Sequence, residues 1–115
     1  MATNSLDEIF ISDTLSHCIQ VFDSKAQFIR KFGIYGTSPN QISHPRGIRV
    51  SETGDVLVCD SVNNRIQVYT SEGNLVHTFG ANHIEKLSSP SDVAILCNGD
   101  VIVSDTNNDR IQIFK

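Results

Sequence analysis

Short apolar runs separated by polar turn residues follow one another along the whole chain. Val56–Cys59 is a continuous apolar run, which is typical of a strand covered on both faces of its sheet. The unit around this run predicts four short strands, and no segment has convincing helical periodicity. These strands are expected at Gly47–Val50, Asp55–Cys59, Arg65–Tyr69 and Asn74–Phe79.

The residues between the apolar runs have the chemistry of tight turns. Asn98-Gly99 is a strong hairpin signal, because both residue types tolerate a positive φ. Thr53-Gly54 and Glu72-Gly73 stand at the other expected turns. The pattern therefore predicts an all-β protein built from antiparallel hairpins.

One sequence pattern occurs three times. The segments 9–22, 56–69 and 101–114 align without gaps, at offsets of 47 and then 45 positions. The alignment superposes Asp13, Asp60 and Asp105, and the matching Phe-Gly pairs that follow end at Gly33 and Gly80. We interpret these five residues as structural repeat positions. A repeat of about 45 residues with four antiparallel strands is typical of a β-propeller blade.

The repeat boundaries divide the chain into a partial blade at 1–33, a full blade at 45–80 and a partial blade at 90–115. The first partial blade is expected to hold strands two to four, and the last one strands one to three. A closed propeller needs about four to eight blades, so about two and a half blades form an incomplete ring. We therefore expect either further blades from a longer chain or self-association.

The repeated residues resemble the NHL repeat. The match comprises Pro45, Gly47, Ile48, Val50, Gly54, Val58, Asp60, Asn63, Arg65, Ile66, Gln67, Val68, Phe79 and Gly80. Cys18 departs from the pattern where the other units have arginine, and Asp92 stands at the position of Gly47. The resemblance implies a propeller like the C-terminal domains of tripartite-motif ubiquitin ligases, which recognise protein substrates or RNA. The RING and B-box of such a ligase are absent from this chain, so the chain itself is not expected to be an enzyme.

Composition agrees with a folded protein that works inside the cell. Of the 115 residues, 39% are hydrophobic and 19% are charged, which is too apolar for a disordered chain. The N-terminus has neither the basic start nor the apolar core of a signal peptide, and the three cysteines do not form a disulfide framework. We therefore expect a cytoplasmic protein that contacts neither membrane nor DNA.

Candidate metal and catalytic motifs are weak. The run from Asp105 to Asp109 imitates the start of a calcium loop, but Arg110 stands where that loop requires glycine. The histidines lack the spacing of a zinc site and are scattered at 17, 44, 77 and 83. Cys59 is interpreted as a small buried apolar residue. No metal, cofactor or catalytic residue is predicted.

The Asp60 and Arg65 pair recurs as Asp105 and Arg110. A structural role explains this repetition better than a catalytic one, because a catalytic residue is normally needed only once. The alternative is that the arginines belong to a partner site on the propeller face that carries the second-to-third strand loops and the connections between blades. The predicted partner-binding residues on this loop face are Tyr35, His44, Arg46, Asn64, Arg65, Asn108 and Arg110.

The net charges of the two propeller faces help to rank protein and RNA as possible partners. We assign a formal net charge of −2 to the loop face and −4 to the opposite face, and neither is a basic footprint for RNA. Arginine and tyrosine are enriched in protein hot spots, so protein recognition ranks above RNA recognition. A third class is a propeller related to zinc-dependent peptidyl-hydroxyglycine lyases, which the absence of a histidine cluster disfavours.

Overall fold

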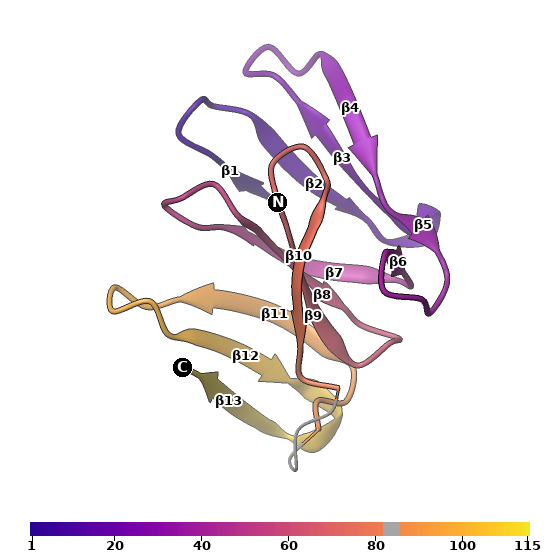
Figure 1. Ribbon diagram of the computed structural model, residues 1–115, viewed down its shortest axis with the longest axis vertical. Helices are drawn as coiled ribbons and strands as arrows, with labels where there is room; N and C mark the ends of the chain where they lie inside the picture. Colours follow the sequence, from indigo (N-terminus) through magenta and orange to yellow (C-terminus); the bar gives the residue numbers. More distant parts are fainter. Residues whose placement is uncertain (82–85) are drawn as a thin grey trace.

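The computed structural model describes residues 1–81 and 86–115 and contains three antiparallel sheets arranged one after another (Figure 1). The first sheet, blade 1, has the order β1-β2-β3-β4, and the second, blade 2, has the order β7-β8-β9-β10. The third sheet, blade 3, consists of β11, β12 and β13. The predicted fold class, an incomplete β-propeller, is confirmed.

The strands have these bounds. Blade 1 comprises β1 (Ala2–Thr3), β2 (Ile9–Asp13), β3 (Cys18–Phe22) and β4 (Phe28–Phe32). Blade 2 comprises β7 (Pro45–Val50), β8 (Val56–Asp60), β9 (Arg65–Tyr69) and β10 (Leu75–Phe79). Blade 3 comprises β11 (Pro90–Ile95), β12 (Val101–Asp105) and β13 (Arg110–Phe114). A short parallel pair, β5 (Ile34–Tyr35) and β6 (Gln41–Ile42), lies in the connection between blades 1 and 2, and two 3₁₀ turns are η1 (Thr14–Ser16) and η2 (Thr106–Asn108).

Two local features differ from the sequence-based expectation. Blade 1 has a fourth strand, because the two residues of β1 pair with β2, where only three strands were expected. In the turn between β11 and β12, Gly99 has a positive φ of 93° but Asn98 does not. The turn closes through the Gly99 N–H, which donates to the Leu96 carbonyl at 2.9 Å. One left-handed residue is therefore enough at this hairpin.

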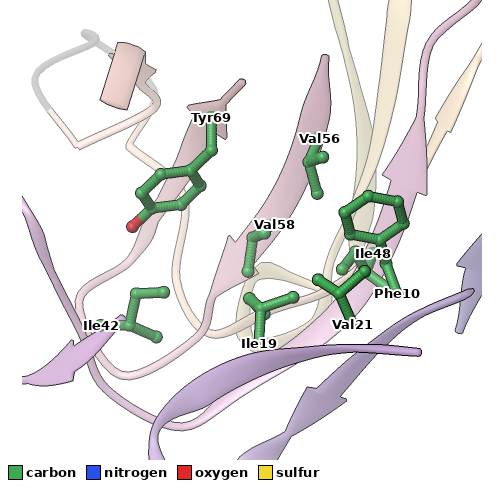
Figure 2. Close-up of a cluster of buried hydrophobic side chains, with 8 residues drawn as sticks. All are labelled: Phe10, Ile19, Val21, Ile42, Ile48, Val56, Val58 and Tyr69. Carbon is green, nitrogen blue, oxygen red and sulfur yellow. The ribbon is translucent and has the colours of Figure 1, made fainter. Parts of the chain in front are cut away.

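The hydrophobic core lies between blades, because the two faces of blade 2 pack in opposite directions. Figure 2 shows the cluster between blades 1 and 2, in which Val56, Val58 and Tyr69 of blade 2 meet Phe10 and other residues of blade 1. The other faces of β8 and β9 contribute to the cluster with blade 3. That second cluster consists of Leu57, Cys59, Ile66, Val68, Leu87, Val93 and Val103. All residues of β8 are buried, as its continuous apolar run predicts, and all residues of β9 are buried as well, including the polar Arg65 and Gln67.

Glycine allows the innermost strands of blades 2 and 3 to approach closely. A Cβ atom at Gly47 would lie 2.5 Å from the Cα atom of Asp92, which no real Cβ contact allows. Asp92 stands at the equivalent position of blade 3 and is exposed. The two positions therefore differ in sequence because only the strand of blade 2 has a neighbouring backbone against it.

The repeated glycines after the outer strands have a different requirement. Gly33 and Gly80 have positive φ values of 101° and 103°, a conformation that favours glycine. They turn the chain from β4 and β10 into the connections that lead to the next blades.

No helix in the described part of the chain is long and apolar enough to cross a membrane.

Candidate functional site on the loop face

The loops that join the second and third strands of each blade lie on the same face as the connections between blades, on the right in Figure 1. Backbone hydrogen bonds join them: the Val62 N–H donates to the Ser43 carbonyl at 3.2 Å, and the Asn107 N–H donates to the Ser88 carbonyl at 3.0 Å. Each connection is thus attached to a loop of the blade that follows it. This face holds the residues that the sequence assigns to partner binding.

Asp60 organises the connection that enters blade 2. Its Oδ1 accepts the Ser43 N–H at 2.7 Å, and its Oδ2 accepts Arg65 Nε at 2.7 Å and Asn63 Nδ2 at 3.0 Å. Asp60 is fully buried, so these bonds are needed to keep its carboxylate in a low-dielectric environment.

Arg65 is committed to the same network. Besides Asp60, its guanidinium donates from Nη2 to the carbonyls of Ser38 and Gln41, both at 2.8 Å. The residue is only 9% exposed. A partner would have to break these contacts to reach the guanidinium, which favours the structural role of Arg65 over a role in partner binding.

Blade 3 repeats the network in a more open form. Asp105 Oδ1 accepts the Ser88 N–H at 2.7 Å, and its Oδ2 accepts Arg110 Nε and Asn108 Nδ2, both at 2.8 Å, and Gln112 Nε2 at 3.0 Å. Burial acts to raise the pKa of Asp105, but these hydrogen bonds outweigh it and lower the pKa to about 2. Asn108 and Arg110, both predicted to bind a partner, therefore support the carboxylate.

Blade 1 has lost part of the network. Cys18 replaces the arginine, and Asp13 Oδ2 accepts Gln20 Nε2 at 2.8 Å. The repeat thus keeps its aspartate where the arginine is absent.

In blade 2, burial raises the pKa of the Cys59 thiol to about 12, so Cys59 stays protonated and is a poor nucleophile, as expected from the sequence.

The last residue of each of the first two loops accepts a hydrogen bond from the connection to the next blade. His17, Asn64 and Asp109 have φ values of 55°, 56° and 52°, so each is left-handed. His17 Nδ1 accepts the His44 N–H at 3.0 Å, and Asn64 Oδ1 accepts the Ser89 N–H at 2.8 Å. Asn64, which the sequence assigns to partner binding, is exposed, yet its side chain shares this repeated contact with the next connection.

His17 is a site residue that sequence analysis missed. Its ring centroid lies 4.3 Å from that of Tyr35 and 4.5 Å from that of His44, and Tyr35 is 63% exposed. The gapless alignment places His17 at the position of Asn64, which is the signal that points to a shared contact with the next connection.

Two exposed apolar residues lie in the loops that adjoin this aromatic group. Leu15 follows Thr14, whose hydroxyl donates to the Pro45 carbonyl at 2.7 Å, and Val62 follows a strand that ends beside Ser43. Leu15 and Val62 are 83% and 55% exposed. We call this region the junction patch, and it consists of Leu15, His17, Tyr35, His44, Arg46 and Val62.

Arg46 is the cation of the junction patch. It is exposed on β7, and its guanidinium makes no hydrogen bond or ion pair with any residue that the structure describes. Among the seven predicted partner residues, Tyr35, His44 and Arg46 therefore come together at the junction of blades 1 and 2. The other four are engaged in the blade networks.

The opposite face contains a cleft of about 640 Å³ between blades 2 and 3. Leu57, Val68 and Phe79 line it together with the turns near Glu52 and Cys97. No group of three or more His, Cys, Asp or Glu residues suited to a metal occurs in ranges 1–81 and 86–115. His83, one of the four scattered histidines, and Glu85, one of the acidic residues assigned to the loop face, lie outside the described residues.

Sequence comparison identifies the repeats. The NHL repeat model matches residues 43–69 and 87–114. The protein brain tumor of Drosophila melanogaster is 33% identical over 87 residues, which cover 74% of this chain and 8% of that protein. The human E3 ubiquitin-protein ligase TRIM32 is 42% identical over 48 residues, which cover 42% of this chain and 7% of the ligase. The chain thus spans less than a tenth of the length of these relatives.

Solved structures agree on the fold. A streptogramin B lyase superposes with a TM-score of 0.71 at 17% identity, covering 96% of this chain and 38% of the lyase. The WD40 β-propeller domain of Doa1 superposes with a TM-score of 0.72 at 18% identity, covering 95% of this chain and 33% of that chain. At such identities the likeness concerns the fold alone. The chain therefore contains NHL repeats at residues 43–69 and 87–114, and it folds as the blades of a β-propeller.

Proposed function

We propose that this chain is a non-catalytic recognition segment that binds a protein partner through the junction patch. The observation that carries the proposal is the exposure of Tyr35 and Arg46, two residue types enriched in protein hot spots, on the same face as the exposed apolar Leu15 and Val62. The strands below them are packed, so the loops present these side chains from a rigid scaffold.

The chemistry of the patch defines the partner. An apolar and aromatic surface with one free guanidinium fits a segment that carries an apolar side chain next to a carboxylate. Similarity to a ubiquitin ligase supports a role in substrate recognition within a larger ligase of the cytoplasm, whose catalytic parts would lie in other domains.

RNA is the second candidate, favoured by the ring group of His17, Tyr35 and His44. Unpaired bases stack on such side chains, and the contribution of each base to binding is about 1–3 kcal/mol. The two candidates differ in salt dependence, because phosphate contacts release counterions and weaken steeply as salt rises.

The test is a binding titration with candidate proteins and single-stranded RNA at low and high salt. The variant Y35A/R46A removes the centre of the junction patch, and E72A/D100A on the opposite face is the matched control. We expect protein binding that is lost in Y35A/R46A, kept in E72A/D100A and only modestly changed by salt. Binding that is lost only in E72A/D100A would place the partner on the other face, and steeply salt-dependent RNA binding would favour the second candidate.

A further inference from the structure

The connection between blades 1 and 2 is attached to the loop of blade 1 through a histidine. The His44 N–H of this connection donates to His17 Nδ1 at 3.0 Å. In the connection between blades 2 and 3, the Ser89 N–H donates to Asn64 Oδ1 of the blade 2 loop at 2.8 Å. His17 and Asn64 occupy the same repeat position, and both have a left-handed backbone. The two connections are thus held by equivalent bonds, but the acceptor is an imidazole nitrogen in one and an amide oxygen in the other.

The two acceptors respond differently to acid. A ring nitrogen that accepts an N–H carries no proton itself, so His17 is a neutral imidazole in this contact. An imidazolium has an N–H at both ring nitrogens, and therefore no rotation of a protonated His17 ring would offer His44 an acceptor. The amide oxygen of Asn64 does not titrate and stays an acceptor. Acid is therefore expected to break the bond at His17 and to leave the bond at Asn64 intact.

The groups that face His17 do not compensate a positive charge on its ring. They are Tyr35 of β5 and His44 of the connection, whose ring centroids lie 4.3 and 4.5 Å from that of His17. Neither histidine forms an ion pair with a carboxylate in ranges 1–81 and 86–115. On β7, Arg46 follows His44 by two residues and is itself a cation. Protonation of His17 thus adds a charge that has no paired carboxylate.

The strand ends of the His17 loop contain two further titratable groups. Asp13 ends β2, and its Oδ2 accepts Gln20 Nε2 at 2.8 Å. Cys18 begins β3, and burial raises the pKa of its thiol, so it stays protonated in acid. Imidazoles change charge between about pH 8 and 5. His17 is therefore the group of this loop whose charge is expected to change in that range.

Other contacts keep blades 1 and 2 together when the histidine bond is lost. The Thr14 hydroxyl donates to the Pro45 carbonyl at 2.7 Å, and this bond does not depend on a titrating group. The apolar cluster between the two blades contains no charged side chain. The effect of acid is therefore local and concerns His44 and Tyr35, whose rings lie against the ring of His17.

We infer that protonation of His17 releases the connection between blades 1 and 2 from the loop of blade 1, so that the junction patch has one arrangement near neutral pH and another in acid. Release removes the support that the His17 ring gives to Tyr35 and adds a positive charge beside Arg46. The connection between blades 2 and 3 keeps its arrangement because its acceptor is Asn64. No partner takes part in this change, so it is independent of the proposed function.

The first test compares two backbone amides in the wild-type chain by nuclear magnetic resonance at about pH 7.5 and about pH 5.5. Hydrogen exchange gives a protection factor for each amide, which corrects for the effect of pH on the intrinsic exchange rate. The protection factor of the His44 amide is expected to fall by about 5-fold in acid, as the loss of one hydrogen bond implies. The Ser89 amide is the control in the same sample and should keep its protection. Unchanged protection at His44, or equal losses at both amides, would overturn the inference.

The second test exchanges the two acceptors. In H17N the first connection receives the acceptor of the second, and asparagine also tolerates a left-handed backbone. The His44 amide should then be equally protected at both pH values, whereas N64H should make the protection of the Ser89 amide depend on pH. Far-ultraviolet circular dichroism checks that both variants are folded. A pH dependence at His44 that persists in folded H17N would show that another group is responsible and would overturn the inference.

Discussion

Blades 2 and 3 have nearly the same strand sequences but different surroundings. Their third strands read RIQVY and RIQIF, yet β9 is buried at every position and β13 is buried at none. The difference arises because blade 2 has a neighbour on both faces and blade 3 on one. In a repeat protein, burial is therefore a property of the position in the array, and equal residues have unequal energetic roles.

The largest effects on the free energy of unfolding are expected in the Asp–Arg networks of blades 2 and 3. Asp60→Ala leaves the buried Arg65 without its carboxylate and is expected to lower the free energy of unfolding by about 3–5 kcal/mol. Asp105→Ala should cost less, because the side chain of Arg110 is 34% exposed and reaches water, whereas that of Arg65 is 11% exposed. Urea unfolding of both variants measures the gap. Equal costs would mean that the exposure of the arginine does not matter.

The apolar positions provide a matched pair. Ile66→Ala removes a fully buried side chain and should cost about 2–5 kcal/mol. Ile111→Ala should cost under about 0.5 kcal/mol, because this side chain is 69% exposed. Equal costs would show that the two blades do not differ in the way the structure describes.

The dependence of stability on pH tests the contribution of Asp105 in blade 3. Asp105 has a folded-state pKa of about 2, below the value of about 3.9 in an unfolded chain. Its stabilising contribution is therefore complete above about pH 4 and is lost as pH falls through about 2. In Asp105→Asn, the fall in the free energy of unfolding over this range should be shallower than in the wild type. An unchanged slope would indicate that other carboxylates dominate.

A small gain in stability is expected from a substitution in the core between blades 1 and 2. The Tyr69 hydroxyl is buried without a hydrogen-bond partner in the described part of the chain, and burial raises the pKa of Tyr69 to about 12. Tyr69→Phe removes an unpaired polar group and should raise the free energy of unfolding by about 0–1 kcal/mol. A loss above about 1 kcal/mol would reveal a partner for this hydroxyl.

The repeat made much of the fold predictable. The predicted third strand, Arg65–Tyr69, begins and ends at the same residues as β9 of the structure, because its apolar alternation and its recurrence along the chain point to the same residues. β1 escaped prediction because the two residues Ala2–Thr3 have no apolar pattern, and their pairing depends on β2. The domain boundaries at 1–33, 45–80 and 90–115 stay predictions.

The candidate site was only partly predictable. The sequence identifies Arg65, Asn108 and Arg110 as polar loop residues, but it does not show that each connection folds back over the following loop and accepts their hydrogen bonds. Conversely, Tyr35 and His17 are far apart in the expected strand pattern and meet because the His44 backbone bonds to His17. Contacts between a connection and two blades are tertiary, and a strand pattern contains no signal for them.

We propose that the repeated arginines support the blades while the unrepeated Arg46 binds the partner, and unfolding and partner binding measured in parallel for Arg65→Ala and Arg46→Ala distinguish the two roles. Arg65→Ala should lower the free energy of unfolding by about 3–5 kcal/mol and leave the affinity of the folded fraction unchanged. Arg46→Ala should change the free energy of unfolding by under about 0.5 kcal/mol and weaken binding by about 1–3 kcal/mol. Wild-type affinity in Arg46→Ala, together with lost affinity in folded Arg65→Ala, would show that Arg65 and not Arg46 binds the partner.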